Sequence, residues 1–189
     1  MLYKLLFSAI IGSFVAIRVH HRKHWTGIER TSVASRRERI LTSGIVISQL
    51  LSAVLWLGGH LAVADLLLPD AIRLSGLLVG IIGLVLLERV HAALGANFSP
   101  RLEIRPDHTL IQHGPYARIR HPMYTSGALL ILSYGLLTAN LIVLLLPAVM
   151  LALLVALRIP DEEAMLEATF GDEYRQWRTK SGYFLPKLS

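Results

Sequence analysis

Two polar stretches of the sequence gather residue types that can do chemistry. Residues 105–124 combine histidines, arginines and tyrosines with turn-forming prolines and glycines, and they lead into an apolar run at Pro122. Proline suits the first turn of a helix, and the start of a helix exposes unpaired backbone N–H groups together with a partial positive charge. This junction is therefore suited to binding a carboxylate or a phosphate.

The second polar stretch, residues 158–177, follows another apolar run and contains closely spaced charges of both signs. Arg158 and Glu162 are four residues apart, so they lie on one face of a predicted helix. A carboxylate at this position can bind an ammonium, and an arginine can hold an anion through paired hydrogen bonds.

The apolar runs beside these stretches, 124–138 and 141–157, are separated only by Ala139 and Asn140. So short a connection predicts a tight helical hairpin, in which the start of the first helix neighbours the end of the second. The residues expected to converge there are His121, Tyr124, Arg158 and Glu162.

Thiol and metal chemistry are not expected. The sequence has no cysteine, which excludes disulfides, cysteine metal ligands and thiol nucleophiles. His20, His21 and His24 have no carboxylate at ligand spacing, so we assign them to a basic loop at the membrane surface and predict no metal.

The composition indicates which elements must position these residues. Of the 189 residues, 53% are hydrophobic and only 17% are charged, and the mean hydropathy is +0.53. This hydropathy excludes a disordered chain. The net charge of +6 alone would be compatible with a nucleic-acid-binding protein, but nucleic-acid binding does not explain the high hydropathy. We therefore predict one integral membrane domain, residues 1–189, that is all-α and contacts membrane lipids.

Hydropathy predicts five transmembrane helices, with the last two forming the hairpin. The polar segments 105–124 and 158–189 of the C-terminal half are expected to build a pocket on the cytoplasmic side. The first apolar run is followed rather than preceded by its basic cluster, which favours an uncleaved helix over a signal peptide. The predicted spans are about 2–17, 41–68, 71–87, 124–138 and 141–157.

The basic residues predict the orientation. Counted by side, 17 of the 19 Lys and Arg residues fall in the two long loops and the C-terminal tail. The positive-inside rule assigns that side to the cytoplasm. The N-terminus is then outside and the active site is cytoplasmic, in the inner or plasma membrane if the chain is prokaryotic.

Several motifs, taken in order, resemble the isoprenylcysteine carboxyl methyltransferase family, within the wider class of integral-membrane methyltransferases. The resemblance covers about 85 residues, nearly half of the chain, and the five-helix plan is similar to that of the small prokaryotic members. The matching motifs are H-T-L at 108–110, G-P-Y at 114–116, R-H-P-x-Y at 120–124, Arg158, Glu162-Glu163 and F-G-x-E-Y at 170–174.

The resemblance implies that S-adenosylmethionine binds on the cytoplasmic side. Glu162 would accept the ammonium of the cofactor, and Arg158 would position the carboxylate of the substrate. The adenosine would contact His108, Thr109, Leu110, Ile111 and Tyr116, and the methionine part would contact His121, Pro122, Met123 and Tyr124.

The implied reaction is carboxyl O-methylation of a lipophilic, isoprenylcysteine-like substrate that enters from the bilayer. A carboxylate with a pKa near 4 is already ionised at neutral pH, so no general base is needed. A site that excludes water and aligns the carboxylate oxygen, the methyl carbon and the sulfur favours the reaction of the anionic carboxylate with the sulfonium of the cofactor. The absence of an obvious nucleophile–base pair is consistent with this chemistry.

Two alternatives remain open. N-methylation of a phospholipid amine would need a base such as His113 or Tyr124, and Arg158 would repel an ammonium. A sterol-type membrane reductase would bind NADPH, whose 2′-phosphate requires clustered cations such as Arg118 and Arg120. The natural acceptor and the oligomeric state are not predicted.

Overall fold

The computed structural model describes residues 1–22, 36–97 and 109–187, and within them the chain is helical. The described part contains five α-helices joined by turns and short 3-10 segments, with two isolated β-bridges. The α-helices are α1 (Leu2–Arg22), α2 (Arg36–Leu57), α3 (Asp70–Leu94), α4 (Pro122–Thr138) and α5 (Leu141–Lys180), and the 3-10 segments are η2 (Ala62–Ala64), η3 (Gly95–Asn97) and η4 (Gly114–Ala117).

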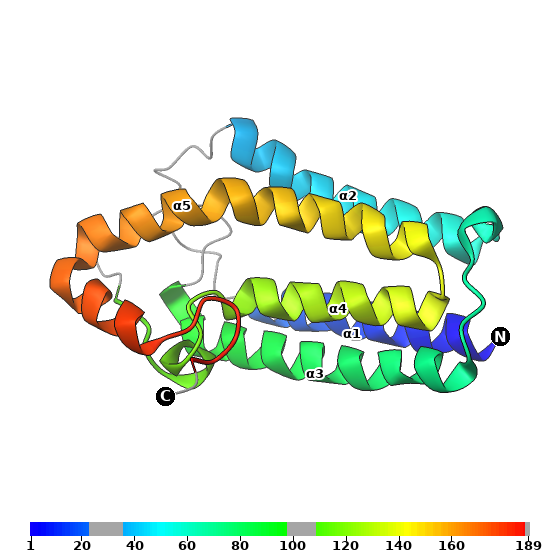
Figure 1. Cartoon of the computed structure of the whole chain (residues 1–189), viewed down its shortest axis with the longest axis horizontal. Coiled ribbons are helices and arrows are strands. Elements are labelled where there is room, and N and C mark those ends of the chain that lie inside the picture. The colour runs from blue at the N-terminus through cyan, green and yellow to red at the C-terminus, as the bar shows by residue number, and fades with distance from the viewer. Residues whose placement is uncertain (23–35, 98–108, 188–189) are drawn as a thin grey trace.

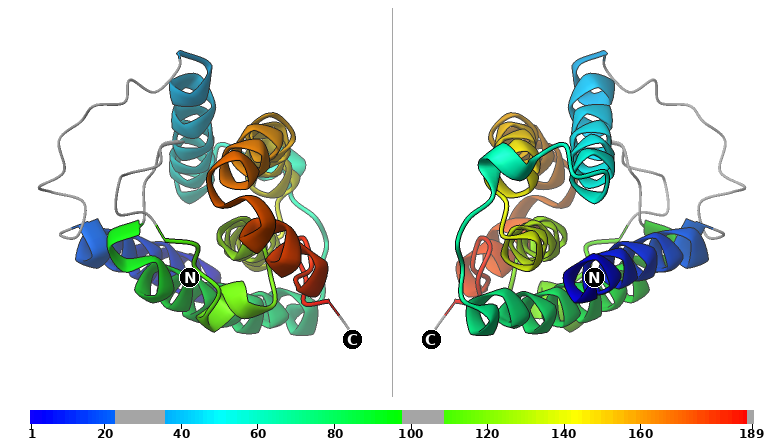
Figure 2. Two further views of the ribbon diagram at one scale, coloured as in Figure 1. Left: turned by 90° about the vertical axis from the view of Figure 1, so that its left-hand side faces the viewer. Right: turned by 90° about the vertical axis from the view of Figure 1, so that its right-hand side faces the viewer.

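The five helices run side by side along the long axis of the molecule (Figure 1). Viewed along that axis, α4 lies among the others, with α3 and α1 on one side and α5 and α2 on the other (Figure 2). We call the end with the α2–α3 and α4–α5 connections the turn end. The opposite end, where α4 begins and the C-terminal residues lie, is the site end.

Helix α4 forms the centre of the packing. Its buried face contains nine residues, and it packs against both α3 and α5. A Cβ added at Gly80 of α3 would lie 2.5 Å from Ser133 Oγ, and that hydroxyl donates to the carbonyl oxygen of Gly76 at 2.7 Å. Small residues on α3 therefore allow its backbone to approach α4 closely.

The protein is an integral membrane protein. Four of its described helices, α1, α2, α3 and α5, are long and apolar enough to cross a membrane, and most of their residues are not buried inside the protein. Exposed leucines and valines such as Leu78 and Val54 cover their outer faces. Helix α4, with 17 residues, is shorter than these four.

Several helix boundaries differ from the predicted spans. Helix α1 continues beyond residue 17 to Arg22, and α2 begins at Arg36 before residue 41. The expected span 41–68 is a helix only to Leu57, because the chain then turns at Gly58 and at Gly59, whose φ of +79° favours glycine. Helix α3 continues beyond the expected residue 87 to Leu94, and α5 continues beyond residue 157 to Lys180. Charged residues after an apolar run end a hydropathy signal, but they do not end a helix.

The turn end is closed by polar side chains that bond to the main chain. Asn140 is fully buried, and its side-chain oxygen accepts from the backbone N–H groups of Ile142 and Val143 at the start of α5. Its Nδ2 donates to the carbonyl oxygen of Leu61 and to Asp65, both at 2.8 Å. This side chain therefore caps α5 and ties it to the α2–α3 connection.

Helix α5 reverses direction before it ends. It contains Pro147 and Pro160, yet the residue with non-helical backbone angles is Gly171, with φ 51° and ψ −120°. Beyond this residue the helix folds back towards the start of α4, as Figure 1 shows. Only glycine adopts this conformation without strain, so Gly171 permits the reversal that builds the site end.

Candidate functional site

A cavity of about 380 Å³ opens at the site end, with walls from all five helices and from the 109–124 segment. The polar lining residues of α4 and α5 (Tyr124, Arg158 and Glu162) lie nearer the start of α4 than the apolar ones (Leu130, Leu151 and Leu154), and we call these two parts the polar half and the apolar half. The apolar wall includes Phe14, Ile45, Val46, Leu87, Leu130, Leu151 and Leu154. The polar wall includes Arg18, Asn97, Thr109, Tyr116, Arg120, Tyr124, Arg158, Glu162 and Trp177.

Glu162 is the carboxylate of this cavity. Tyr124 donates its hydroxyl to Glu162 Oε2 at 3.1 Å, and Arg158 Nε lies 3.8 Å from the same oxygen. The side chains of Arg158 and Glu162 are only 13% and 27% exposed. Charges that are this little exposed are weakly screened by water, so each of them attracts an opposite charge in the cavity more strongly than it would in bulk water.

The neighbouring Glu163 points elsewhere. Its Oε1 accepts from Arg120 Nη1 at 2.7 Å and lies 3.0 Å from His121 Nε2, and its side chain is 16% exposed. Residues that are adjacent in a helix face directions about 100° apart. Glu162 therefore faces the cavity, while Glu163 holds the segment that leads into α4.

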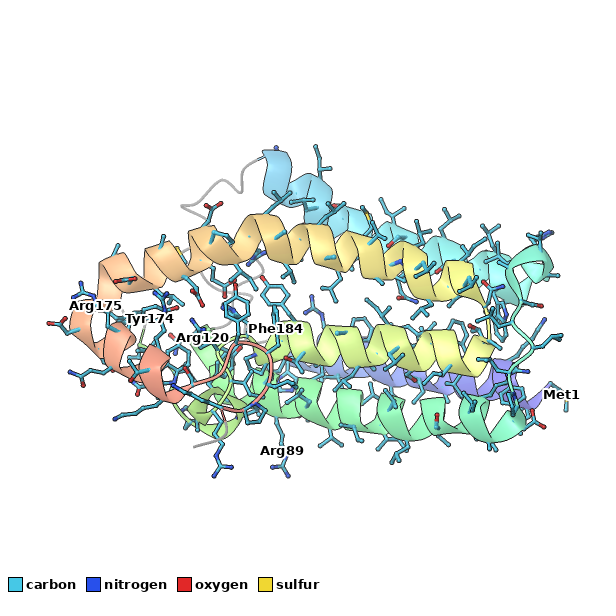
Figure 3. All side chains as sticks on the ribbon, in the orientation of Figure 1. Met1, Arg89, Arg120, Tyr174, Arg175 and Phe184 are labelled. Atoms are coloured by element: carbon cyan, nitrogen blue, oxygen red, sulfur yellow. The ribbon has the colours of Figure 1, made fainter. Side chains whose placement is uncertain are left out.

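The residues after α5 complete the support of that segment. We call Ser181–Phe184 the strap. Gly182 exchanges backbone hydrogen bonds with Arg118 and Arg120 at 2.9 and 2.8 Å, and His121 N donates to the carbonyl oxygen of Tyr183 at 3.1 Å. Figure 3 shows Arg120, Tyr174 and Phe184 gathered at this end of the molecule, far from Met1.

The strap also contributes ring contacts. The Arg120 guanidinium lies 4.8 Å from the centre of the Tyr183 ring, and the His121 ring lies 5.0 Å from the same ring. A cation over an aromatic face is attracted by the electrons of the ring. Arg120 is therefore held between Glu163 and Tyr183, with part of its side chain on the cavity wall.

The returning part of α5 positions the turn before α4. Trp177 is buried, and its Nε1 donates to the carbonyl oxygen of Tyr116 at 2.9 Å. On the other side, Asn97 Nδ2 donates to Thr109 Oγ1 at 3.1 Å. Both ends of the 109–116 segment are therefore fixed by side chains that line the cavity.

The tyrosines near the site remain neutral. Desolvation, together with nearby Glu162 and Tyr124, raises the pKa of the Tyr116 hydroxyl well above its usual range. Desolvation and then Glu163 raise the pKa of Tyr174 to about 12 and also raise the pKa of Tyr183. These hydroxyls therefore stay protonated and do not act as bases at neutral pH.

The structure brings most of the predicted site residues into one cavity. The predicted residues that line it are Thr109, Leu110, Ile111, Tyr116, Met123, Tyr124, Arg158 and Glu162. His121 and Pro122 are buried behind this wall and do not line the cavity. His108 lies outside the described residues.

Sequence reasoning did not assign several residues that line the cavity. Trp177 is brought to the site only by the reversal at Gly171. Arg120 belongs to the R-H-P-x-Y motif, and a role was considered for it only in the reductase alternative. Asn97 and Arg18 come from other helices, and no local pattern marks them. In the described part of the chain, no three His, Asp or Glu residues are arranged to hold a metal.

Comparison with known proteins places these residues in a family context. The model of the isoprenylcysteine carboxyl methyltransferase (ICMT) family matches residues 74–168, half of the chain. Protein-S-isoprenylcysteine O-methyltransferase of Schizosaccharomyces pombe is 39% identical over 82 residues, which are 43% of this chain and 35% of that protein. The matched stretch is thus about a third of that relative's length.

A longer alignment and a solved structure extend the similarity. Protein-S-isoprenylcysteine O-methyltransferase A of Arabidopsis thaliana is 25% identical over 94% of this chain and 86% of its own length. The structure of a eukaryotic intramembrane Ras methyltransferase ICMT superposes with a TM-score of 0.58 at 21% identity, covering 96% of this chain and 67% of that one. At this identity the structural match supports a common fold.

Proposed function

The chain belongs to the isoprenylcysteine carboxyl methyltransferase family, and from this premise we propose that it transfers the methyl group of S-adenosylmethionine to the carboxylate of a lipophilic, isoprenylcysteine-like acceptor. The observation that carries the proposal is the divided cavity. A polar half with Glu162 and Arg158 continues into an apolar half between the helices. A polar cofactor and a lipid-like acceptor would meet at the boundary between the two halves.

The residues present fit the cofactor. S-adenosylmethionine carries an ammonium, a carboxylate and a flat adenine ring, and when bound it would supply an electron-poor methyl group. Glu162 is suited to the ammonium. Arg120 is suited to the carboxylate, because it lines the cavity and its guanidinium has more donors than the Nη1 group that Glu163 accepts from. Trp177 and Tyr116 provide aromatic surface for the ring.

Arg158 would orient the acceptor. It lies one helical turn before Glu162 on α5, with Leu154 and Leu151 following towards the apolar half. A carboxylate held at Arg158 would direct an attached tail along these leucines. The acceptor is already ionised at neutral pH, so the protein needs to hold, align and dehydrate it but not to remove a proton.

The proposed topology follows from the charge distribution. All five helices would span the membrane, with α4 and α5 as a hairpin, and the site end would face the cytoplasm of a cell with an inner or plasma membrane. The 17 basic residues on the site side of the predicted spans support this orientation. The acceptor would then enter from the bilayer and the cofactor from the cytoplasm.

Family membership supports this function over the two alternatives. Reduction with NADPH has no support in the family match, and N-methylation would place an amine beside Arg158. The tyrosines with raised pKa values, Tyr116 and Tyr174, would also be poor bases for an amine.

Calorimetry on the purified protein tests the proposal. We expect binding of S-adenosylmethionine but not of NADPH. Glu162→Gln removes a charge-assisted contact worth about 1.5–3 kcal/mol, so the dissociation constant should rise roughly 10- to 150-fold. Glu167→Gln is the matched control, since Glu167 is on the same helix but pairs with Arg175 and Arg178 outside the cavity. Binding of NADPH alone, or equal affinity in the Glu162 variant, would contradict the assignment.

A further inference from the structure

The space beside two glycines on one face of α4 indicates how far α5 lies from this helix. Gly135 and Gly127 are eight residues apart, slightly more than two turns. A Cβ added at Gly135 would lie only 2.7 Å from Leu144 Cβ of α5. A Cβ added at Gly127 would meet nothing nearer among the described residues than the Cδ atoms of Leu151, at 3.9 and 4.0 Å. The helices are therefore in close contact near the turn end and have separated by Gly127.

Packing does not account for a glycine at position 127. In the interior of a helix, glycine is about 1 kcal/mol less favourable than alanine. At Gly76, Gly80 and Gly135 a close neighbouring helix leaves no room for a side chain, with contacts at 2.5–2.8 Å. At Gly127 the backbone is helical with no positive φ, and the space beside it is the cavity.

Gly127 lies on the wall of the apolar half of the cavity, at the level of Leu151 on α5. Both Gly127 and Leu151 line the cavity, opposite each other. Leu151 precedes Arg158 on α5 by seven residues, which is about 10 Å along the helix axis. A tail that is attached to a carboxylate at Arg158 and runs through the cavity towards the turn end would therefore reach the level of Gly127 and Leu151 once it is longer than about 10 Å.

We propose that Gly127 determines which acceptors the protein takes: because this lining residue has no side chain, the cavity keeps room for a long tail at the level of Leu151. This inference rests on the proposed methyl transfer and adds a residue that selects the length of the substrate. A large side chain at position 127 would project into the cavity, which excludes long tails and leaves short acceptors and the cofactor unaffected.

The experiment compares two acceptors that share a head and differ in the tail, N-acetyl-S-dimethylallylcysteine and N-acetyl-S-farnesylcysteine. For Gly127→Leu we expect the ratio of kcat/KM for the farnesyl over the dimethylallyl acceptor to fall at least about tenfold. Gly127→Ala, whose Cβ sits at ordinary contact distance from Leu151, should give a smaller fall and keeps the test valid if the leucine variant does not fold. Gly12→Leu on α1 is the control, because Gly12 is exposed and a Cβ there meets no described atom within 4 Å.

Binding measurements separate this inference from the proposed function. The affinity for S-adenosylmethionine should stay within twofold in all three variants, and direct binding of the farnesyl acceptor should weaken only in the Gly127 variants. An unchanged farnesyl preference in folded Gly127 variants overturns the inference, and so does loss of cofactor binding in them. Absence of cofactor binding and methyl transfer in the unsubstituted protein would instead refute the proposed function, while the binding of the two acceptors would still decide the role of Gly127.

Discussion

The two ends of the bundle use polar side chains in opposite ways. At the turn end, Asn140, Arg73 and Lys4 each bond to backbone carbonyl oxygens of another segment. At the site end, Arg158 and Glu162 form the wall of a cavity. The same helices therefore carry a closed end that holds them together and an open end whose charges face a cavity.

This difference predicts that substitutions at the two ends separate stability from activity. A polar group that is paired with the backbone contributes to folding, and its loss leaves a buried partner unsatisfied. A polar group on a cavity wall contributes to ligand binding instead. The following predictions test that division, from the largest expected effect to the smallest.

Arg158→Ala should have the largest effect, and it should be confined to activity. Removing the cation that positions the carboxylate should reduce kcat/KM for methyl transfer about 1,000-fold, or about 4 kcal/mol. The affinity for S-adenosylmethionine and the thermal unfolding midpoint in detergent should change little. Arg178→Ala, which alters a half-exposed arginine on the same helix, serves as the control. If Arg158→Ala weakens cofactor binding as much as Glu162→Gln does, Arg158 contacts the cofactor and not the acceptor.

Asn140→Ala should have the opposite profile. It removes the cap of α5 and leaves the carbonyl oxygen of Leu61 without its donor, so we expect a loss of about 2–3 kcal/mol in the free energy of unfolding. Cofactor affinity measured below the unfolding transition should be unchanged. Ser75→Ala, at an exposed position near the same end, should cost less than about 0.5 kcal/mol. A fall in cofactor affinity would show that the two ends are coupled.

The pH dependence of unfolding should show the smallest effect, visible only in alkali. The pKa of Tyr174 is raised to about 12 in the folded protein from 10.0, so folding favours the neutral phenol. Its contribution to stability is complete below pH 10 and is lost as the pH rises from 10 to 12. Tyr174→Phe should therefore flatten the decline of the unfolding midpoint in that window and leave it unchanged at pH 7. An equal decline in both proteins would mean that Tyr174 titrates normally.

The sequence predicted the helices and the convergence of the start of α4 with α5 because both depend on local patterns. Apolar runs indicate where helices cross a membrane, and the two-residue connection at Ala139 and Asn140 brings the start of α4 near α5. The contact of Tyr124 with Glu162 confirms that these segments converge. The end of α2 was less predictable, since residues 58–68 are apolar enough to continue a span but fold as turns.

Other features depend on geometry that no local pattern encodes. Which of two adjacent glutamates faces the cavity is decided by the rotation of α5 about its axis, and packing along the whole helix sets that rotation. The role of Trp177 depends on a single glycine angle at Gly171. His121 has the residue type of a ligand, yet its ring is turned to Glu163 and Tyr183.

The strap also affects the order in which parts of the protein can fold during synthesis. Gly182 and Tyr183 bond to residues 118–121, which leave the ribosome roughly 60 residues earlier. At about 5–20 residues per second, several seconds of synthesis separate the two. During that time α1 to α4 can already pack in the membrane, while the segment before α4 still lacks the backbone partners that fix it. The nascent chain is thus a bundle of helices first and acquires a formed site end only after its tail has been synthesised.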